Sequence, residues 1–314
     1  MTLVRRDLLP IYQQSLISVI LKSLSFVRSE NAAISLINNG LVELNGVVVK
    51  SNLIVSQDDS LVLLTPRSLE PSVDSNYSLV FQDDFILVVN KPSNLPVHPT
   101  GKYYFNSLVS ILKSDYPGVD LHPVHRLDRE TSGLVVFAKS KSIAKILFKQ
   151  FRDGSVKKTY LAIVHGLPHS SGSFSFPLVE SSFGDIRNAV LPVSVGKISR
   201  TDYSLISSTL DSRFSLVRIV PKSGKKHQIR VHFSTAGFPI VGDKIYGFHP
   251  EMFSDFVHGN LSFATVLSLW FSPSHLLHCS TISFKHPETG VLVEFNADFG
   301  KNIVEFMNTV HFSS

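Results

Sequence analysis

The sequence predicts an α+β protein, in which a small helix-plus-hairpin module precedes a larger domain built on a largely antiparallel sheet. The 314 residues are 43% hydrophobic and only 18% charged, which indicates a folded chain long enough for one large and one small domain. Strand-like runs are many and helical patterns few, which favours an antiparallel sheet. Prolines and small polar residues gather in residues 66–76, so we expect a linker there between domains at 1–65 and 77–314.

The small module is predicted from one helix and one tight hairpin. Residues 31–37 have a helical pattern that ends at Asn38-Asn39-Gly40, a common helix stop. Residues 41–49 contain two strand-like runs on either side of Asn45-Gly46, the dipeptide typical of a two-residue hairpin turn. One more short strand is expected at 61–64.

The larger domain is predicted mainly from short apolar runs. Its clearest helix spans 142–152, where Ile143, Leu147 and Phe151 share one face and Ser142 is a suitable N-cap. Strands are expected at 86–89, 133–138, 160–164, 214–220, 228–233 and 281–284.

Composition limits where the protein acts and what it is. Cys279 is the only cysteine of the chain, which excludes an intramolecular disulfide and favours a reducing compartment, so we expect a cytoplasmic protein. No apolar stretch approaches the roughly 18 residues that a membrane-spanning helix needs. We expect no membrane partner and a monomer.

The basic residues are concentrated in two segments. The net charge is +5, but residues 1–65 hold five basic and five acidic residues. Residues 139–158 hold seven Lys or Arg against one Asp, and residues 218–230 hold five and no acid. Such segments attract a polyanion such as nucleic acid, although a solvated lysine-rich face would have the same composition.

The densest polar cluster is HPVHRLDRETSG at 122–133, directly before an apolar run. Asp128 lies between Arg126 and Arg129, and nearby cations would keep its carboxylate ionised, as a nucleophile requires. A structural ion-pair network of these residues is the alternative.

Two further features have both a functional and a structural interpretation. In SGKKHQIRVH (223–232), Gln228, Arg230 and His232 would share one face of a strand, where the arginine could pair with a carboxylate or a phosphate. An exposed face of an edge strand is equally consistent. Tyr160 opens an apolar strand, where it either packs in the core or stacks on a base.

Metal and phosphate-loop sites are not predicted. His122 and His125 have no third ligand at a zinc-site spacing, and Gly101-Lys102 lacks the first glycine and the Ser/Thr of a phosphate loop. We therefore expect no metal site.

Taken together, these motifs resemble those of RluA-type pseudouridine synthases over roughly residues 77–298. HRLDRETSGLVVFAKS (125–140) closely resembles the central motif of that family. FQDDFILVVNKPSNLPVHPTG (81–101), KKTYLAIVHG (157–166), SGKKHQIRVHFSTAGFPIVGDKIYG (223–247) and LLHCSTISFKHPETG (276–290) are similar to the other motifs in the same order. Residues 27–64 are similar to the small RNA-binding domain named after ribosomal small-subunit protein four.

The resemblance implies isomerisation of uridine to pseudouridine in ribosomal or transfer RNA, without an external cofactor. It implies that Asp128 attacks the nucleoside, that Arg230 pairs with Asp128, and that Tyr160 stacks on the flipped base and helps to remove its C5 proton. The residues expected to bind RNA are His125, Arg126, Arg129, Lys145, Lys149, Lys157, Lys225, Lys226, His227 and Gln228, with Arg28 and Lys50 in the small module.

Two other functions stay open at this point. One is a non-catalytic RNA-binding protein that keeps the fold, which would not need Asp128, Tyr160 and Arg230 together. The other is an N-glycosidase, which would release free uracil.

Overall fold

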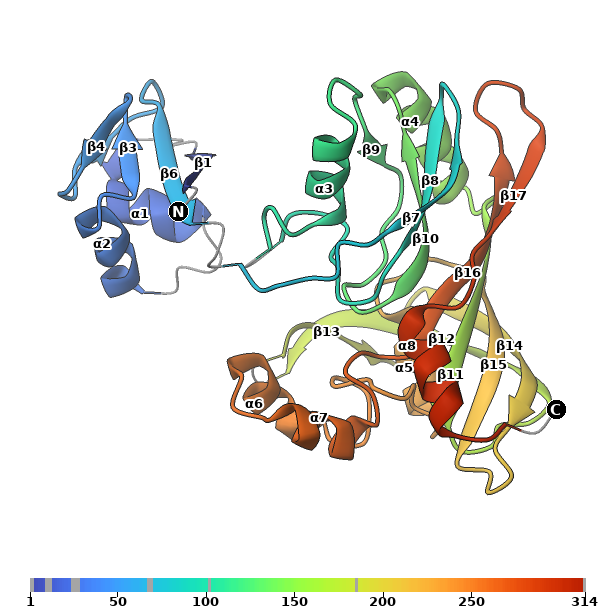
Figure 1. Cartoon of the computed structure of the whole chain (residues 1–314). Coiled ribbons are helices and arrows are strands. Elements are labelled where there is room, and N and C mark those ends of the chain that lie inside the picture. Colours follow the sequence, from blue (N-terminus) through green and yellow to red (C-terminus); the bar gives the residue numbers. More distant parts are fainter. Residues whose placement is uncertain are drawn as a thin grey trace. The chain divides into compact units, whose positions relative to one another are not determined.

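The computed structural model describes residues 3–8, 13–23, 29–66, 70–100, 103–183 and 186–312. The chain forms two compact units, one made of Met1–Val73 with His98–Ile111 and the other of Asp74–Val97 with Leu112–Ser314 (Figure 1). No helix within these described ranges is both long and apolar enough to cross a membrane.

The first unit packs two helices on a four-stranded antiparallel sheet. Leu16, Ile20 and Ile37 from the helices share one core with Val42 and Leu63 from the strands. The elements are α1 (Leu16–Ser23), α2 (Glu30–Asn38), β1 (Leu3–Leu8), β3 (Val42–Leu44), β4 (Val47–Val49) and β6 (Leu61–Pro66), with β2 (Gln14–Ser15) and β5 (Ile54–Val55) as a separate pair.

The predicted helix and hairpin of this unit are confirmed. Gly40 has a φ of 67°, the left-handed conformation that ends α2. Asn45 and Gly46 have φ values of 51° and 81°, and two successive positive values are what a type I′ hairpin turn requires. The side-chain oxygen of Asn45 also accepts the backbone N–H of Ser60 at 2.8 Å, which ties the turn to the strand beside it.

Part of the segment expected to be a linker makes specific contacts within the first unit. The carboxylate of Glu70 accepts the backbone N–H groups of Tyr104, Phe105 and Asn106 at 2.9 to 3.1 Å. The side-chain amide of Asn106 donates to the carbonyl of Pro71 at 2.8 Å. Residues 70–71 are therefore anchored to the loop at 104–106.

The second unit is built on an eleven-stranded sheet, which confirms the predicted α+β class with a mostly antiparallel sheet. Its main path runs β13-β12-β14-β15-β11-β16-β10-β8-β7, and β9 and β17 pair with β10 and β16. Each ladder is antiparallel except β10 with β16, which is parallel. The strands are β7 (Ser78–Gln82), β8 (Ile86–Lys91), β9 (His122–Pro123), β10 (Ser132–Ala138), β11 (Lys157–His165), β12 (Ser171–Phe183), β13 (Ile186–Pro192), β14 (Ile198–Ser208), β15 (Phe214–Pro221), β16 (Leu277–Lys285) and β17 (Leu292–Asn296).

Helix α8 packs against this sheet. Ile303 and Phe306 of α8 pack on Ile163 of β11 and on Phe214 and Leu216 of β15, and Figure 1 shows α8 beside these strands. The helices are α4 (Lys141–Arg152), α5 (Gln228–Thr235), η2 (Pro250–Met252), α6 (Phe253–His258), α7 (Phe263–Trp270) and α8 (Lys301–Thr309), and α3 (Leu108–Asp115) crosses the boundary between the two units in sequence.

The parallel contact between β10 and β16 depends on Gly133. Gly133 pairs with Cys279 and has a φ of 111°, which L side chains rarely adopt. A Cβ atom at this position would overlap the backbone of Cys279. Glycine therefore lets the two strands come together directly after the HRLDRET loop.

The structure corrects two local predictions. Helix α4 begins at Lys141, and its N-cap is Ser140, whose side chain accepts the N–H of Ile143, rather than Ser142. Residues 228–233 form the start of helix α5 rather than a strand. Their alternating polar side chains are all buried: Gln228 and His232 contact Thr201, and Arg230 contacts Asp128. The period of two in the sequence therefore did not reflect one solvated face of a strand.

Candidate active site

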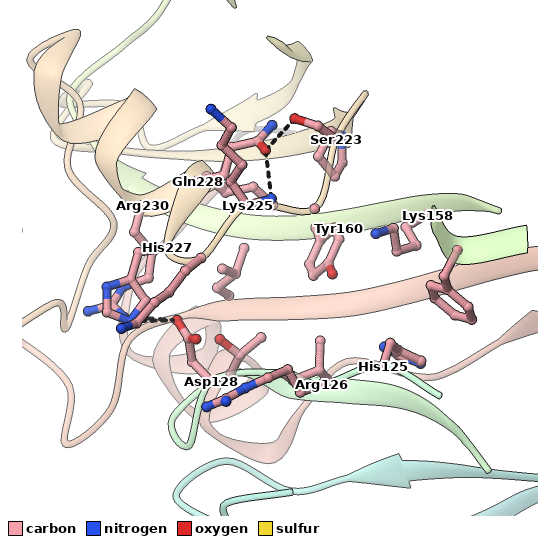
Figure 2. A pocket seen from close by; sticks show the side chains of 18 of the residues that line it. His125, Arg126, Asp128, Lys158, Tyr160, Ser223, Lys225, His227, Gln228 and Arg230 are labelled. Atoms are coloured by element: carbon pink, nitrogen blue, oxygen red, sulfur yellow. Dashed lines mark hydrogen bonds and ion pairs between the residues drawn. The ribbon is translucent and has the colours of Figure 1, made fainter. Parts of the chain in front are cut away.

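A pocket of about 640 Å³ opens in the second unit. Its walls come mainly from residues 124–131 before β10, from the first residues of β11, and from residues 221–230, which lead from β15 into α5. Phe148, Phe151 and Arg152 of α4 also line it. Figure 2 shows Tyr160 extending from β11 toward the segment that carries Asp128 and His125. The sequence-predicted Asp128, Tyr160 and Arg230 are thus brought together.

Asp128 is held by Arg230, not by the arginines next to it in sequence. Its Oδ2 accepts from Arg230 Nη1 at 2.9 Å, and its side chain keeps 24% exposure. Burial alone would raise the pKa of this carboxyl, but the charge and hydrogen bond of Arg230 lower the pKa below its usual value. The carboxylate is therefore ionised and still accessible from the pocket.

Arg230 is fixed from behind by a second carboxylate, which the sequence reasoning did not single out. Asp243 accepts from Arg230 Nε at 2.6 Å and from Nη2 at 2.8 Å, and only 1% of Asp243 is exposed. The backbone N–H groups of Ile245 and Tyr246 donate to Asp243 at 3.0 Å each. In the sequence, only the position of this acid after the apolar run in FPIVGDKIYG hints at such a role.

His227 approaches the same oxygen of Asp128 as Arg230 does. Its backbone has a φ of 52°, which turns the chain into α5, and its Nε2 lies 3.7 Å from Asp128 Oδ2. Its Nδ1 lies 2.8 Å from the Tyr246 hydroxyl, which itself accepts the N–H of Val190. Burial, with the charge of Arg230, lowers the pKa of His227 to about 4, so the ring is neutral at pH 7.

Tyr160 faces the pocket from a bulge in β11. The register of β11 with β16 shifts between Thr159 and Tyr160, and such a shift re-aims the following side chain. The tyrosine is 9% exposed and lines the pocket. Burial, with the neighbouring Cys279 thiol, raises its pKa well above the usual value. The side chain is a neutral phenol whose ring is available for stacking.

The wall near the start of β11 is aromatic and basic. The His125 ring stacks on Phe151 with centroids 4.8 Å apart, and His125 Nε2 accepts the N–H of Val136. Burial lowers the pKa of His125 to about 3, so this ring is also neutral. The ammonium of Lys158 lies 5.9 Å from the centre of the Phe151 ring.

A buried ion-pair network stands behind the site, as one reading of the HRLDRET cluster predicted. Glu130 accepts from Lys244 Nζ at 2.9 Å and from Arg129 Nη2 at 3.0 Å. Arg129 also donates to the side-chain oxygen of Asn94. Burial would raise the pKa of Glu130, yet the charges of Lys244 and Arg129 lower it to about 2. The residues of the HRLDRET cluster therefore have two different environments. Glu130 and Arg129 belong to the buried ion-pair network, whereas Asp128 faces the pocket.

The other residues expected to bind RNA have different environments. Arg126 lines the pocket and is exposed. Lys225, Lys226 and Gln228 also line it, but each makes an intramolecular contact, with Lys197, Glu180 and Ser223 respectively. Four of the residues expected to bind RNA are exposed but do not line the pocket: Lys145, Lys149, Lys157 and Lys50. Arg28 lies outside the described residues.

No group of three or more His, Cys, Asp or Glu side chains that could hold a metal ion occurs in the part of the chain that the structure describes.

The chain is similar to known RNA pseudouridine synthases. A family model described as RNA pseudouridylate synthase matches residues 85–235. The chain is 34% identical to ribosomal large subunit pseudouridine synthase D of Zymomonas mobilis over 246 residues, covering 76% of this chain and 74% of that protein. It is also 34% identical to the dual-specificity RNA pseudouridine synthase RluA of Haemophilus influenzae over 231 residues, or 73% of this chain and 94% of that protein.

A solved structure is similar over about three quarters of the chain. The structure of human RNA pseudouridylate synthase domain containing 4 superimposes with a TM-score of 0.59 at 26% identity, covering 76% of this chain and 94% of that one.

Proposed function

The chain belongs to the RluA-type family of RNA pseudouridine synthases, and on that premise we propose that Asp128 is the nucleophile that attacks a flipped uridine in this pocket. The observation that carries the assignment is the ion pair between Asp128 and Arg230, 2.9 Å long, at the pocket wall. Because Arg230 lowers the pKa of Asp128, the carboxylate is ready to attack the sugar C1′ or the uracil base.

The proposed reaction is an isomerisation whose atoms balance without a redox partner. The bond between N1 and C1′ breaks, the uracil turns, and a bond between C5 and C1′ forms. The proton that leaves C5 is balanced by one gained at N1. The enzyme has to extrude the base from the RNA stack to reach both positions, and the pocket volume of about 640 Å³ is in the range of small-molecule sites.

We assign the uracil-stacking role to Tyr160. Its ring lies in the wall of the pocket that Asp128 also lines, and its raised pKa favours the neutral phenol over the phenolate. A neutral phenol supports stacking and hydrogen bonding better than it supports removal of the C5 proton as a free base.

The RNA is proposed to be ribosomal or transfer RNA, modified in the cytoplasm by a monomer. The name of the Zymomonas relative refers to the large ribosomal subunit, and that of the Haemophilus relative to dual specificity. Mapping pseudouridines in ribosomal and transfer RNA from cells with and without the protein identifies the position. Sites that persist without the protein are not its substrates.

The assignment of the nucleophile is tested with Asp128→Asn. This variant keeps the size of the side chain but removes the charge, so we expect no pseudouridine above the contaminating background and nearly unchanged folding and RNA affinity. Purified wild type and variant are incubated with the mapped RNA, and pseudouridine is measured by mass spectrometry.

Free uracil is measured in the same reactions. Substantial turnover by Asp128→Asn would falsify the nucleophile assignment. Uracil in place of pseudouridine from the wild type would show an N-glycosidase instead, and RNA binding with neither product would show a binding protein.

A further inference from the structure

One face of α4 combines cations with an exposed aromatic side chain. Lys141, Lys145, Phe148 and Arg152 follow one another at spacings of four, three and four residues, which places them along a single face of the helix. All four are exposed or partly exposed. The opposite face packs on the sheet through Ile143, Ala144 and Leu147.

This face reaches the active-site pocket at one end. Phe148 and Arg152 line the pocket, whereas Lys141 and Lys145 do not. The Phe148 side chain is 48% exposed, and its helix neighbour Phe151 stacks on His125 inside the pocket. The Arg152 side chain is 76% exposed, and its ion pair within the described residues is a 3.4 Å contact with the exposed Asp153.

We propose that this face is the subsite for the nucleotide next to the flipped uridine, with Phe148 stacking on its base and Arg152 and Lys145 contacting phosphates. The inference rests on the proposed function, because it concerns RNA held beside the same pocket. Aromatic side chains beside a basic track are the usual means of holding an unpaired strand. The seven basic residues against one acid in 139–158 supply the charge complementarity.

The structure offers a matched control on the same helix. Ile146 is 44% exposed, close to the value for Phe148, but it does not line the pocket. Both side chains are about half-exposed, so the two alanine variants should be similarly stable. Only Phe148→Ala should change RNA binding.

The experiment combines protein and RNA substitutions on an Asp128→Asn background, where no chemistry intervenes. The probe is a fluorescent synthetic stem-loop with the mapped uridine, made also with an abasic residue at each flanking position in turn. We expect Phe148→Ala to weaken affinity about tenfold on the intact stem-loop, the scale of one stacked base. The penalty should vanish on the one abasic stem-loop that lacks the stacking base, and Phe148→Trp should restore affinity.

Two results would overturn the subsite. One is a Phe148→Ala variant that binds like Ile146→Ala on the intact stem-loop. The other is a Phe148→Ala penalty that remains the same on every abasic stem-loop, because the ring would then act without a base. A wild-type protein that makes no pseudouridine on the intact stem-loop refutes the proposed function separately, since the affinity series does not depend on turnover.

Discussion

Arg230 donates hydrogen bonds to two carboxylates at once. Its Nη1 donates to Asp128 at the pocket, and its Nε and Nη2 donate to Asp243 behind it. Because hydrogen bonds on two edges fix the orientation of the guanidinium, Arg230 holds the carboxylate of Asp128 in one position. With Asp128 as the proposed nucleophile, we expect Asp243 to be a positioning residue that acts on the reaction only through Arg230.

We expect Asp243→Asn to lower kcat by roughly 10- to 100-fold with little change in KM, because a slightly misplaced reactive group costs about that much. It should also cost about 3–5 kcal/mol of stability, since Arg230 loses a buried charged partner. Single-turnover rates and urea unfolding measure the two effects. Full kcat with reduced stability would leave Asp243 a purely structural residue.

At this scale, the sequence pointed to three residues that the structure brings into one pocket, and it did not point to the residues that support them. Asp128, Tyr160 and Arg230 stand in long motifs, and the structure lines one pocket with all three. The cation beside Asp128 is 102 residues away, so no local pattern could predict this pairing, and only the resemblance to the family implied it. For the same reason the flanking arginines were given a role in ionising Asp128 for which the structure uses Arg230.

Among the elements, α5 shows why a pattern of alternating polarity can mislead. Its sequence QIRVHF has the period of a strand, but its polar side chains are buried against partners on different elements: Gln228 and His232 contact Thr201, and Arg230 contacts Asp128. Tertiary hydrogen bonds therefore outweigh local preference. The strands with continuous apolar runs, such as β8 and β10, were predicted close to their observed bounds.

The pairing of β10 with β16 gives a sharp prediction for glycine. Gly133→Ala should cost more than about 4 kcal/mol or prevent soluble expression, because its Cβ meets the backbone of Cys279 at a positive φ. Gly154→Ala is the control: its φ is 73°, with nothing within 4 Å of the added Cβ, and it should cost about 1 kcal/mol. Chemical denaturation gives both values, and similar losses would contradict the close-approach argument.

The exposed lysines near α4 are expected to act through charge alone. Changing Lys145, Lys149 and Lys157 together to Gln should make the slope of log affinity against log salt less steep, by about 0.7 to 0.9 for each phosphate that the variant no longer neutralises. Lys301→Gln on α8, also exposed, serves as the comparison. A slope identical to that of the wild type would mean that these lysines are merely solvated.

For the whole molecule, the N-terminal module is the part whose role stays a prediction. Residues 1–65 carry no net charge, although they resemble an RNA-binding domain. We expect deletion of 1–65 to leave the second unit folded and active on a short stem-loop. Activity on the full RNA should fall about tenfold, or 1.4 kcal/mol, because the truncated protein would lack one or two ion pairs with phosphates.

The comparison is kcat/KM on both RNAs for the full-length and truncated proteins. A cut after residue 76 is a useful second variant, because it also removes Glu70 and frees three backbone N–H groups at 104–106. Equal losses on the short and the full RNA after the first cut would show that the module supports folding and not RNA anchoring.

The place of β16 in the sheet has a consequence for how an active molecule arises during synthesis. Among the strands that the structure describes, β16 alone joins the half of the main path that holds β10 to the half that holds β11 and β15. Asp128 lies in the segment before β10, whereas Tyr160 lies in β11 and Arg230 in α5, the helix that follows β15. The ribosome makes β16 after every other strand of that path, and its Ser132–His278 contact closes a loop of 146 residues, a slow kind of closure. A nascent chain therefore holds Asp128, Tyr160 and Arg230, the three residues proposed to act on the uridine, before β16 can join the two halves of the sheet.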